Sequence, residues 1–237
     1  ELLLALSGWR DDQRSGTRRD FALFARGTTK AVTDAEWRWL EEVLDLADFG
    51  IERHTPLLLI AAPLTFELAG GELPLTAFPD FAALTPATLD QATAVRGKLA
   101  RWLLVENRTS FERVARRREP DIGVVWLPGY PPSWWRGAMA KLLSLAPASA
   151  QIACDPDPAG IAIALEASRP WDEAGIAWEP WRMAADDLAG LKTRQSLTAA
   201  DRRLLDSLMQ RPLPGSLAEL ARWILDRGEK GEQEGYL

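Results

Sequence analysis

Two stretches of the sequence decide the fold: Trp102-Leu103-Leu104-Val105-Glu106-Asn107 and Gln151-Ile152-Ala153-Cys154-Asp155-Pro156-Asp157. Each is a short apolar run that ends abruptly in carboxylates. An apolar run of this length, bounded by turn residues, is typical of a buried parallel strand. Ligands of an open α/β sheet bind beyond the carboxyl ends of its strands. We therefore expect Glu106, Asp155 and Asp157 to lie at one edge of a sheet.

Three carboxylates at one edge repel one another, and a hard divalent cation relieves that repulsion. Oxygen ligands favour magnesium, with manganese as an alternative. The competing interpretation is structural, because Asp157 precedes Pro158 and could cap a helix that begins there. Glu106 favours the metal, since a carboxylate that ends a buried strand is costly unless it is paired or metal-bound. The sequence thus predicts Asp155 and Asp157 as ligands, and Glu106 as a ligand or as a general acid or base.

The order of apolar runs and helical patterns predicts an α/β fold. Strands are expected at 101–106, 121–127, 150–154 and 177–183, with helices between the first three at 110–118 and 133–146 and another at 158–167. Such short crossovers give a parallel four-stranded sheet flanked by helices. This domain would span residues 99–237, including C-terminal helices that follow Thr198 and Ser216. Residues 1–98 are expected to form a separate small α+β region, with a capping box at Thr33 and Glu36 and a hairpin around Gly70.

Composition narrows the class of protein. Among its 237 residues there is one cysteine and one histidine, so an internal disulfide is excluded and a histidine-rich zinc site or a Ser/His/Asp triad is disfavoured. No apolar run approaches the ~18–20 residues that a membrane-spanning helix needs. We expect a cytoplasmic protein without a membrane partner.

The basic charge is local. The formal net charge of the chain is −6, yet residues 96–118 hold eight basic side chains and two acidic ones. Contact with phosphates requires such a local patch and not a basic chain as a whole. Arg108, Arg136 and Lys141 are candidates for phosphate contact. The alternative is that the arginines near residue 116 form a solvated helix end.

Several motifs occur together in an order that resembles a known family. They are Val105-Glu106-Asn107, the turn Leu127-Pro128-Gly129-Tyr130-Pro131, and Asp155-Pro156-Asp157-Pro158-Ala159-Gly160-Ile161. This order resembles the Toprim domain, in the branch that holds the topoisomerase VI A subunit and the nuclease subunit of the Wadjet (SMC-like) plasmid-defence systems. Trp181-Arg182-Met183 and Glu232-Gln233-Glu234 are similar to stretches of Wadjet-type proteins. The resemblance covers residues 99–237.

The resemblance implies a Toprim-like sheet and a magnesium-dependent DNA endonuclease that serves an SMC-like complex against plasmid or foreign DNA. It implies that Glu232 and Glu234 help to complete the metal shell, whereas composition alone indicates a charged tail. Gly129, Tyr130 and Gly160 would lie against the DNA, and a glycine permits the close approach of backbone to phosphate. Each glycine could equally serve only its turn.

The sequence also departs from the family. Topoisomerase VI cuts DNA with a tyrosine in a domain before the Toprim, but Tyr130 and Tyr236 both follow Glu106. Hydrolysis is therefore expected in place of covalent cleavage, and Pro128 stands where relatives tend to carry a lysine. Two other functions stay open: a non-catalytic DNA-binding or assembly module, and a phosphotransferase, although no Gly-x-x-x-x-Gly-Lys loop supports the latter. Cutting both strands needs two sites, which favours a homodimer.

Overall fold

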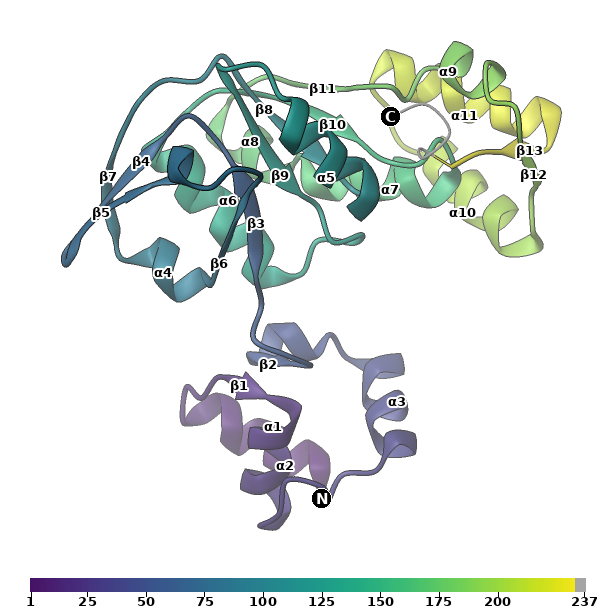
Figure 1. Cartoon of the computed structure of the whole chain (residues 1–237). Helices are drawn as coiled ribbons and strands as arrows, with labels where there is room; N and C mark the ends of the chain where they lie inside the picture. The colour runs from purple at the N-terminus through teal and green to yellow at the C-terminus, as the bar shows by residue number, and fades with distance from the viewer. Residues whose placement is uncertain (233–237) are drawn as a thin grey trace. The chain divides into compact units, whose positions relative to one another are not determined.

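The computed structural model describes residues 1–232 and divides into two compact units (Figure 1). The first unit holds Glu1–Leu57 with Pro132–Trp134, and the second holds Leu58–Pro131 and the chain from Trp135 onward. The sequence placed the boundary after residue 98 instead. The two differ because residues 58–98 contribute strands to the main sheet of the second unit. No helix in the described range is long and apolar enough to cross a membrane.

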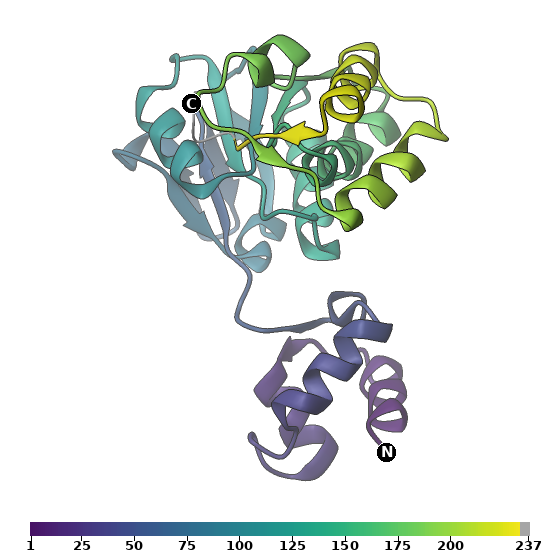
Figure 2. The ribbon, with the colours of Figure 1, turned by 90° about the vertical axis from the view of Figure 1, so that its right-hand side faces the viewer.

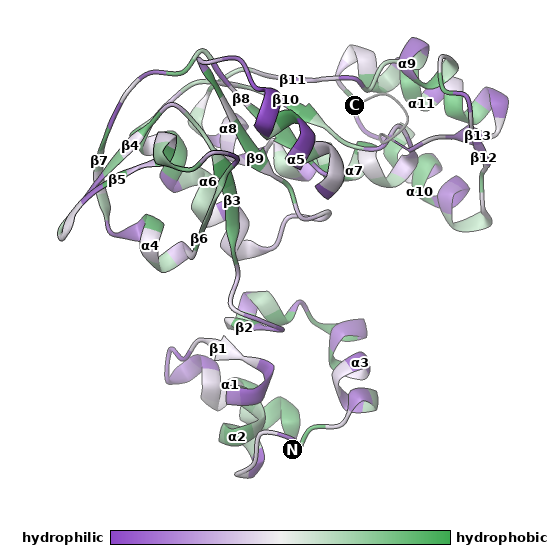
Figure 3. Cartoon of the chain, viewed as in Figure 1, coloured by the Kyte–Doolittle hydropathy of each residue, from purple (hydrophilic) through white to green (hydrophobic). Residues whose placement is uncertain are grey.

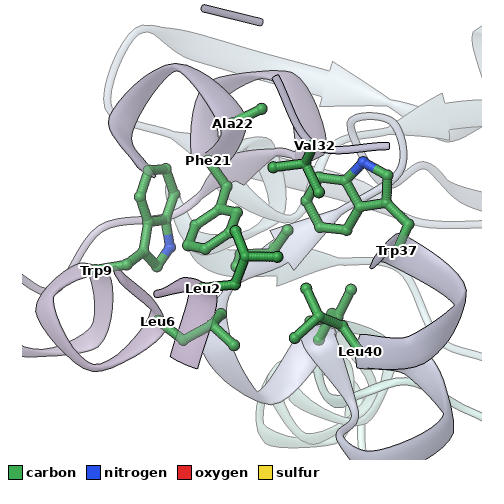
Figure 4. Packing of buried hydrophobic residues seen from close by; sticks show 10 residues of the cluster. Leu2, Leu6, Trp9, Phe21, Ala22, Val32, Trp37 and Leu40 are labelled. Carbon is green, nitrogen blue, oxygen red and sulfur yellow. The ribbon is translucent and has the colours of Figure 1, made fainter. Parts of the chain in front are cut away.

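The first unit consists of short helices around an aromatic core (Figure 4). Its elements are α1 (Leu2–Asp11), β1 (Gly16–Thr17), α2 (Arg18–Arg26), α3 (Asp34–Val43), the 3-10 helix η1 (Leu46–Phe49) and β2 (Ile51–Glu52). The predicted capping box is confirmed, since Glu36 N–H donates to Thr33 Oγ1 and the Glu36 carboxylate accepts from Thr33 N–H. The ring of Phe21 meets Trp9 and Trp37 edge-on, with centroids 5.6 and 5.9 Å away. These tryptophans are core residues.

A six-stranded mixed sheet forms the centre of the second unit. Its strands, in spatial order, are β11 (Trp178–Pro180), β10 (Ser149–Ala153), β8 (Arg101–Val105), β9 (Ile122–Trp126), β3 (Leu58–Ala61) and β6 (Ala82–Leu84). Strands β8, β9, β10 and β11 run parallel to one another, β3 pairs antiparallel with both β9 and β6, and β6 is the edge strand. The α/β class is therefore confirmed.

The expectation of a wholly parallel four-stranded sheet is corrected to this larger mixed sheet. Strand β3 lies within residues 1–98, which the sequence assigned to a separate N-terminal region. All four of its residues are buried, because β3 lies between β9 and β6. Strand β6 is only three residues long, too short for its alternation to be read. These added strands explain why residues 58–98 belong to the second unit.

Segments between β3 and β8 in the sequence form a second, smaller antiparallel sheet. It contains β4 (Thr65–Leu68), β5 (Gly71–Pro74) and β7 (Ala92–Arg96), and the 3-10 helix η2 (Leu75–Ala77) follows β5. The predicted hairpin is confirmed in β4 and β5. Helix α4 (Pro86–Asp90) has Thr85 as its N-cap and proline at its first position.

Helices cover both faces of the main sheet. Helix α5 (Arg108–Arg117) packs Phe111 and Ala115 on the face that carries Leu103 and Val105. The other helices are α6 (Ser133–Leu145), α7 (Pro158–Ala167), α8 (Arg169–Ala174), α9 (Ala185–Ala189), α10 (Ala199–Met209) and α11 (Gly215–Arg227). Helices α10 and α11 pack on α7 (Figure 2), and the short strands β12 (Gln195–Ser196) and β13 (Glu229–Lys230) pair beside them.

The contact between Gly123 of β9 and Trp102 of β8 allows the packing of these two strands to be tested. A Cβ at Gly123 would come within 2.5 Å of the Trp102 ring. The ring is buried and its Nε1 donates to Ala146 O at 3.1 Å, so it cannot move away from a new side chain without losing these contacts. We expect Gly123→Ala to lower the free energy of unfolding by about 1–3 kcal/mol in denaturant titration.

Gly137→Ala on α6 is the control for this change. A Cβ there meets no neighbouring atom within 4 Å, and alanine has the higher helix propensity, so a gain of about 0.5–1 kcal/mol is expected. Equal effects of the two substitutions would contradict the packing of β8 against β9.

Candidate functional site

The carboxyl edge of the main sheet brings two predicted carboxylates together. Glu106 follows β8 and Asp155 follows β10, and these strands are parallel neighbours with Val105 opposite Ala153. Glu106 N–H donates to Ala153 O at 2.9 Å, which continues the ladder beyond the strands. Asp155 N–H then donates to Glu106 Oε2 at 3.2 Å. The expectation that strand ends place these residues at one edge agrees with this geometry.

The electrostatics of the edge are unfavourable to ionisation. Burial, and then the charge of Asp155, raise the pKa of Glu106 to about 7. Burial raises the pKa of Asp157 to about 6, although its hydrogen bond from Gly160 N–H opposes the change. At neutral pH this edge therefore holds negative charge that a cation would stabilise.

Asp157 has a structural role that the alternative interpretation anticipated. It is the N-cap of α7, and its Oδ1 accepts from Gly160 N–H at 2.6 Å. Its Oδ2 lies 3.8 Å from Lys230 Nζ, which also contacts Asp201 Oδ2 at 3.0 Å. Both oxygens of Asp157 are thus engaged by groups of the protein. Sequence reasoning missed Lys230, which follows Asp157 only after several intervening helices.

The donor set fits a divalent cation in part. Among residues 1–232, no three His, Cys, Asp or Glu side chains are arranged as a ready-made metal site. Glu106 and Asp155 supply oxygen atoms of the kind that magnesium prefers, and the Asp155 charge makes ionisation of Glu106 costly. These two residues fit the ion best, whereas Asp157 would have to exchange its contact with Lys230 for one with the metal.

The C-terminal segment reaches the acidic loop, as the metal-shell hypothesis requires. Gly231 N–H donates to Pro156 O at 3.3 Å, directly between Asp155 and Asp157. The side chain of Glu232 is nevertheless exposed and accepts from Gln195 Nε2 at 2.8 Å. Glu234 lies outside the described residues. The structure thus brings the backbone of this segment to the site but directs Glu232 to another partner.

Three residues that sequence reasoning did not assign to the site hold it in place. Trp126, the last residue of β9, donates from Nε1 to Glu106 O at 2.9 Å. The Cys154 thiol is fully buried and hydrogen-bonds the Glu106 side chain, and Cys154 N–H donates to Met183 Sδ at 3.4 Å. Met183 belongs to the Trp181-Arg182-Met183 motif, which therefore lies beside the acidic loop. The motif was the only signal for this contact in the sequence.

The turn after β9 lies at the same edge. Gly129 has a φ of 65°, and a side chain there would meet nothing within 4 Å, so the turn presents open backbone. Tyr130 is 55% exposed. Burial, and then the charge of Asp157, raise its pKa. Arg136 donates from Nη1 to Pro131 O at 2.6 Å and so stabilises the turn.

The remaining phosphate candidates lie at different places. Arg108 is the first residue of α5, immediately after the acidic edge, where it pairs with Glu112 at 2.8 Å and stacks 5.3 Å from the Trp126 ring centroid. Lys141 is eight residues into α6, about 12 Å along a helix that leads back toward the start of β10. The fold therefore keeps Arg108 near the carboxylates and places Lys141 away from them.

Gly160 serves the loop itself. It is buried in the first turn of α7, and a Cβ there would collide with the backbone oxygen of Asp155. The sequence suggested that Gly160 lets a phosphate come close to the backbone. In the structure, the backbone of Asp155 occupies that space instead. Glycine is required here because the acidic loop folds tightly over the helix start.

Comparison of the sequence with protein-family models gave no match, and comparison with curated proteins gave none either.

The pKa of Glu106 predicts a pH dependence of stability. The ordinary value is 4.5 and the folded value is about 7, so between these values the unfolded chain releases a proton that the folded chain keeps. The contribution of Glu106 to the free energy of unfolding therefore falls as pH rises through this window, by about 2–3 kcal/mol. Glu106→Gln cannot ionise. We expect the variant to equal the wild type near pH 5 and to exceed it by that amount at pH 8, in urea titrations with EDTA.

Glu173→Gln, a change at an exposed residue of α8, provides the matched control and should follow the wild-type profile. Parallel pH profiles for the wild type and Glu106→Gln would show that Glu106 ionises without penalty.

Proposed function

We propose that the chain is a magnesium-dependent DNA endonuclease that hydrolyses phosphodiester bonds at the edge formed by Glu106 and Asp155. The fold would be Toprim-like, with β8, β9, β10 and β11 as its parallel core and α5, α6 and α7 as its flanking helices. Manganese is an alternative ion. Within the Wadjet-like class, the chain would serve as the nuclease subunit of an SMC-like complex that acts on plasmid or foreign DNA.

One observation carries the proposal. Glu106 and Asp155 end adjacent parallel strands, and the amide of one donates to the carboxylate of the other at 3.2 Å. Burial and the charge of Asp155 oppose ionisation of Glu106, so the ionised pair destabilises the fold without a cation, and natural sequences tend to accept such a cost at functional sites. The position matches the edge where open α/β sheets bind ligands.

The residues at this edge suit hydrolysis of a phosphodiester. Glu106 and Asp155 would hold the cation, which supplies neutralisation of phosphate charge and activation of water. In the alternative role that the sequence left open, Glu106 does not hold the ion, and with a pKa of about 7 it can accept or return a proton near neutral pH. Water would add to phosphorus as the bond to the leaving oxygen breaks. The proton lost by water would pass to a carboxylate, and the leaving oxygen would take up a proton from a carboxylic acid or from solvent. Trp126 and the Asp155 amide fix the orientation of Glu106 during this step.

Binding of the DNA would use the rim of the same edge. Arg108 at the start of α5 and the open backbone of Gly129 can approach a phosphate. Tyr130 is exposed at the same turn. Double-stranded DNA, SMC-like subunits and a second copy of the chain are the proposed partners, in the cytoplasm. A homodimer would supply one site for each strand.

A specific observation favours a second function, a non-catalytic DNA-binding or assembly module. Asp157 caps α7 and faces Lys230, and no three candidate ligands in residues 1–232 form a ready-made metal site. A lysine beside the acidic loop can substitute for a cation and stabilise the edge permanently. Such a module would bind DNA without magnesium, and more tightly as salt is lowered.

Cleavage of supercoiled plasmid distinguishes the two functions. The purified chain should produce nicked or linear DNA with magnesium or manganese and none with EDTA. Glu106→Gln and Asp155→Asn should reduce the rate at least about 100-fold, since each removes a charge that contacts the ion or moves the proton. Glu173→Gln should cut at the wild-type rate. Binding of DNA that is unaffected by EDTA, without cutting by any variant, would favour the module.

Two substitutions at Asp157 distinguish its role as the N-cap of α7 from a role of its negative charge in cleavage. Asparagine keeps an oxygen for Gly160 N–H, so Asp157→Asn should keep the stability of α7, whereas Asp157→Ala should lose about 1 kcal/mol. If Asp157 also binds the cation, both variants lose cutting. Full activity in Asp157→Asn with reduced stability in Asp157→Ala would assign the residue to the helix cap alone.

A further inference from the structure

A second charged site lies at the opposite end of β8. Beside the last turn of α5, a cavity of about 340 Å³ opens on the α5 face of the sheet. Its polar and aromatic lining includes Arg101, Arg113, Arg117, Arg118, Gln151 and Trp181. Arg101 precedes Glu106 by five residues of extended chain, so about 16 Å separate the two along β8. The end of the cavity at Arg101 therefore lies away from Glu106, whereas Trp181, whose N–H donates to Ile152 O, lines the part nearer the carboxylate edge.

The helical spacing of α5 and the alternation of side chains along β8 place these arginines on the side of the cavity. Arg113 and Arg117 are four residues apart on α5, so they share one side of the helix. Arg101 is two residues before Leu103 on β8, and Leu103 is opposite Gln151 of β10, so all three lie on the same face of the sheet. Figure 3 colours α5 as largely hydrophilic.

The charges of this cavity are not neutralised by the protein. Within residues 1–232, none of the four arginines forms an ion pair with a carboxylate, although Glu119 also lines the cavity. Other arginines of α5 are paired: Arg108 contacts Glu112, and Arg116 contacts Asp80 and Glu112. The contrast along a single helix shows that unpaired positive charge is concentrated on the cavity side.

Two of the guanidinium groups also carry buried donors without acceptors. In the described part of the chain, Nε of Arg101 and Nε of Arg118 are shielded from solvent and have no hydrogen-bond partner. A buried donor left unsatisfied destabilises the fold, and like charges close together add to that cost. An anion with several oxygen atoms would satisfy the donors and neutralise the charge at once.

The chemistry of the lining identifies the anion. Guanidinium groups bind phosphate through paired N–H donors, which suits the cluster of four. Apolar side chains, among them Leu103, Val114 and Trp181, form the rest of the wall and favour a ligand with an uncharged part. We propose that this arginine cavity binds the phosphate group of a nucleotide, either free or within a nucleic-acid strand.

Calorimetric titration of the full chain in EDTA tests the proposal with three probes. They are inorganic phosphate, deoxyadenosine monophosphate and a short single-stranded oligodeoxynucleotide with hydroxyl ends. We expect a nucleotide probe to bind, and Arg113→Gln to weaken it at least about tenfold. Arg117→Lys keeps the charge but loses the paired donors, so it should also weaken binding. Binding of the monophosphate indicates a free nucleotide, and binding of the oligonucleotide alone indicates a strand.

Arg116→Gln is the matched control, because Arg116 belongs to the same helix but is paired outside the cavity. It should leave nucleotide affinity unchanged, as should Glu106→Gln at the other end of β8. The unliganded melting temperature of Arg113→Gln should equal or exceed that of the wild type, since a like charge is removed. Failure of both nucleotide probes to bind, or an equal loss of affinity in Arg116→Gln, would overturn the proposal. Retained binding in Glu106→Gln without cutting separates this site from the proposed nuclease.

Discussion

The parallel pairing of β8 with β10 is the constraint on which the candidate site depends. Its register sets Val105 opposite Ala153, and the next residues on each strand continue the pairing through Glu106 N–H and Ala153 O. Because side chains alternate and the register is fixed, Glu106 and the loop beginning at Asp155 must meet. The burial, and then the repulsion from Asp155, that raise the pKa of Glu106 therefore follow from backbone hydrogen bonds and not from a flexible approach of side chains.

The stabilising interactions around this edge are mostly backbone and indole contacts. Trp126 holds the Glu106 carbonyl, and Trp135 in turn donates from Nε1 to the Trp126 carbonyl at 3.0 Å. Tight loop packing at Gly160 holds Asp157 over the helix start. These contacts fix the carboxylates without neutralising them, which is the arrangement that a pre-organised ion or phosphate site requires.

Local signals in the sequence predicted most of the second unit's core, and non-local contacts account for what was missed. The apolar runs at β8, β9 and β10 and the cap at Asp157 depend on neighbouring residues, so spacing was sufficient to predict them. The place of β3 in the main sheet and the approach of Lys230 to Asp157 depend on tertiary pairing between distant segments. No periodicity encodes such pairing. The placement of Lys141 depends on a related property, because the spacing of residues along a helix does not say which end of the helix lies nearer the carboxyl edge of the sheet.

Strand β8 links two regions of opposite charge, and in each region the charged groups lower the stability of the fold. At its carboxyl end, Glu106 is difficult to ionise beside Asp155, and at its start, Arg101 has a buried donor without an acceptor. An ion pair between the two ends would remove both costs, but the rigid strand holds them about 16 Å apart. The charge at one end of β8 therefore cannot neutralise the charge at the other end. This separation explains why Arg101, at the start of β8, does not neutralise Glu106, which follows the carboxyl end of the same strand.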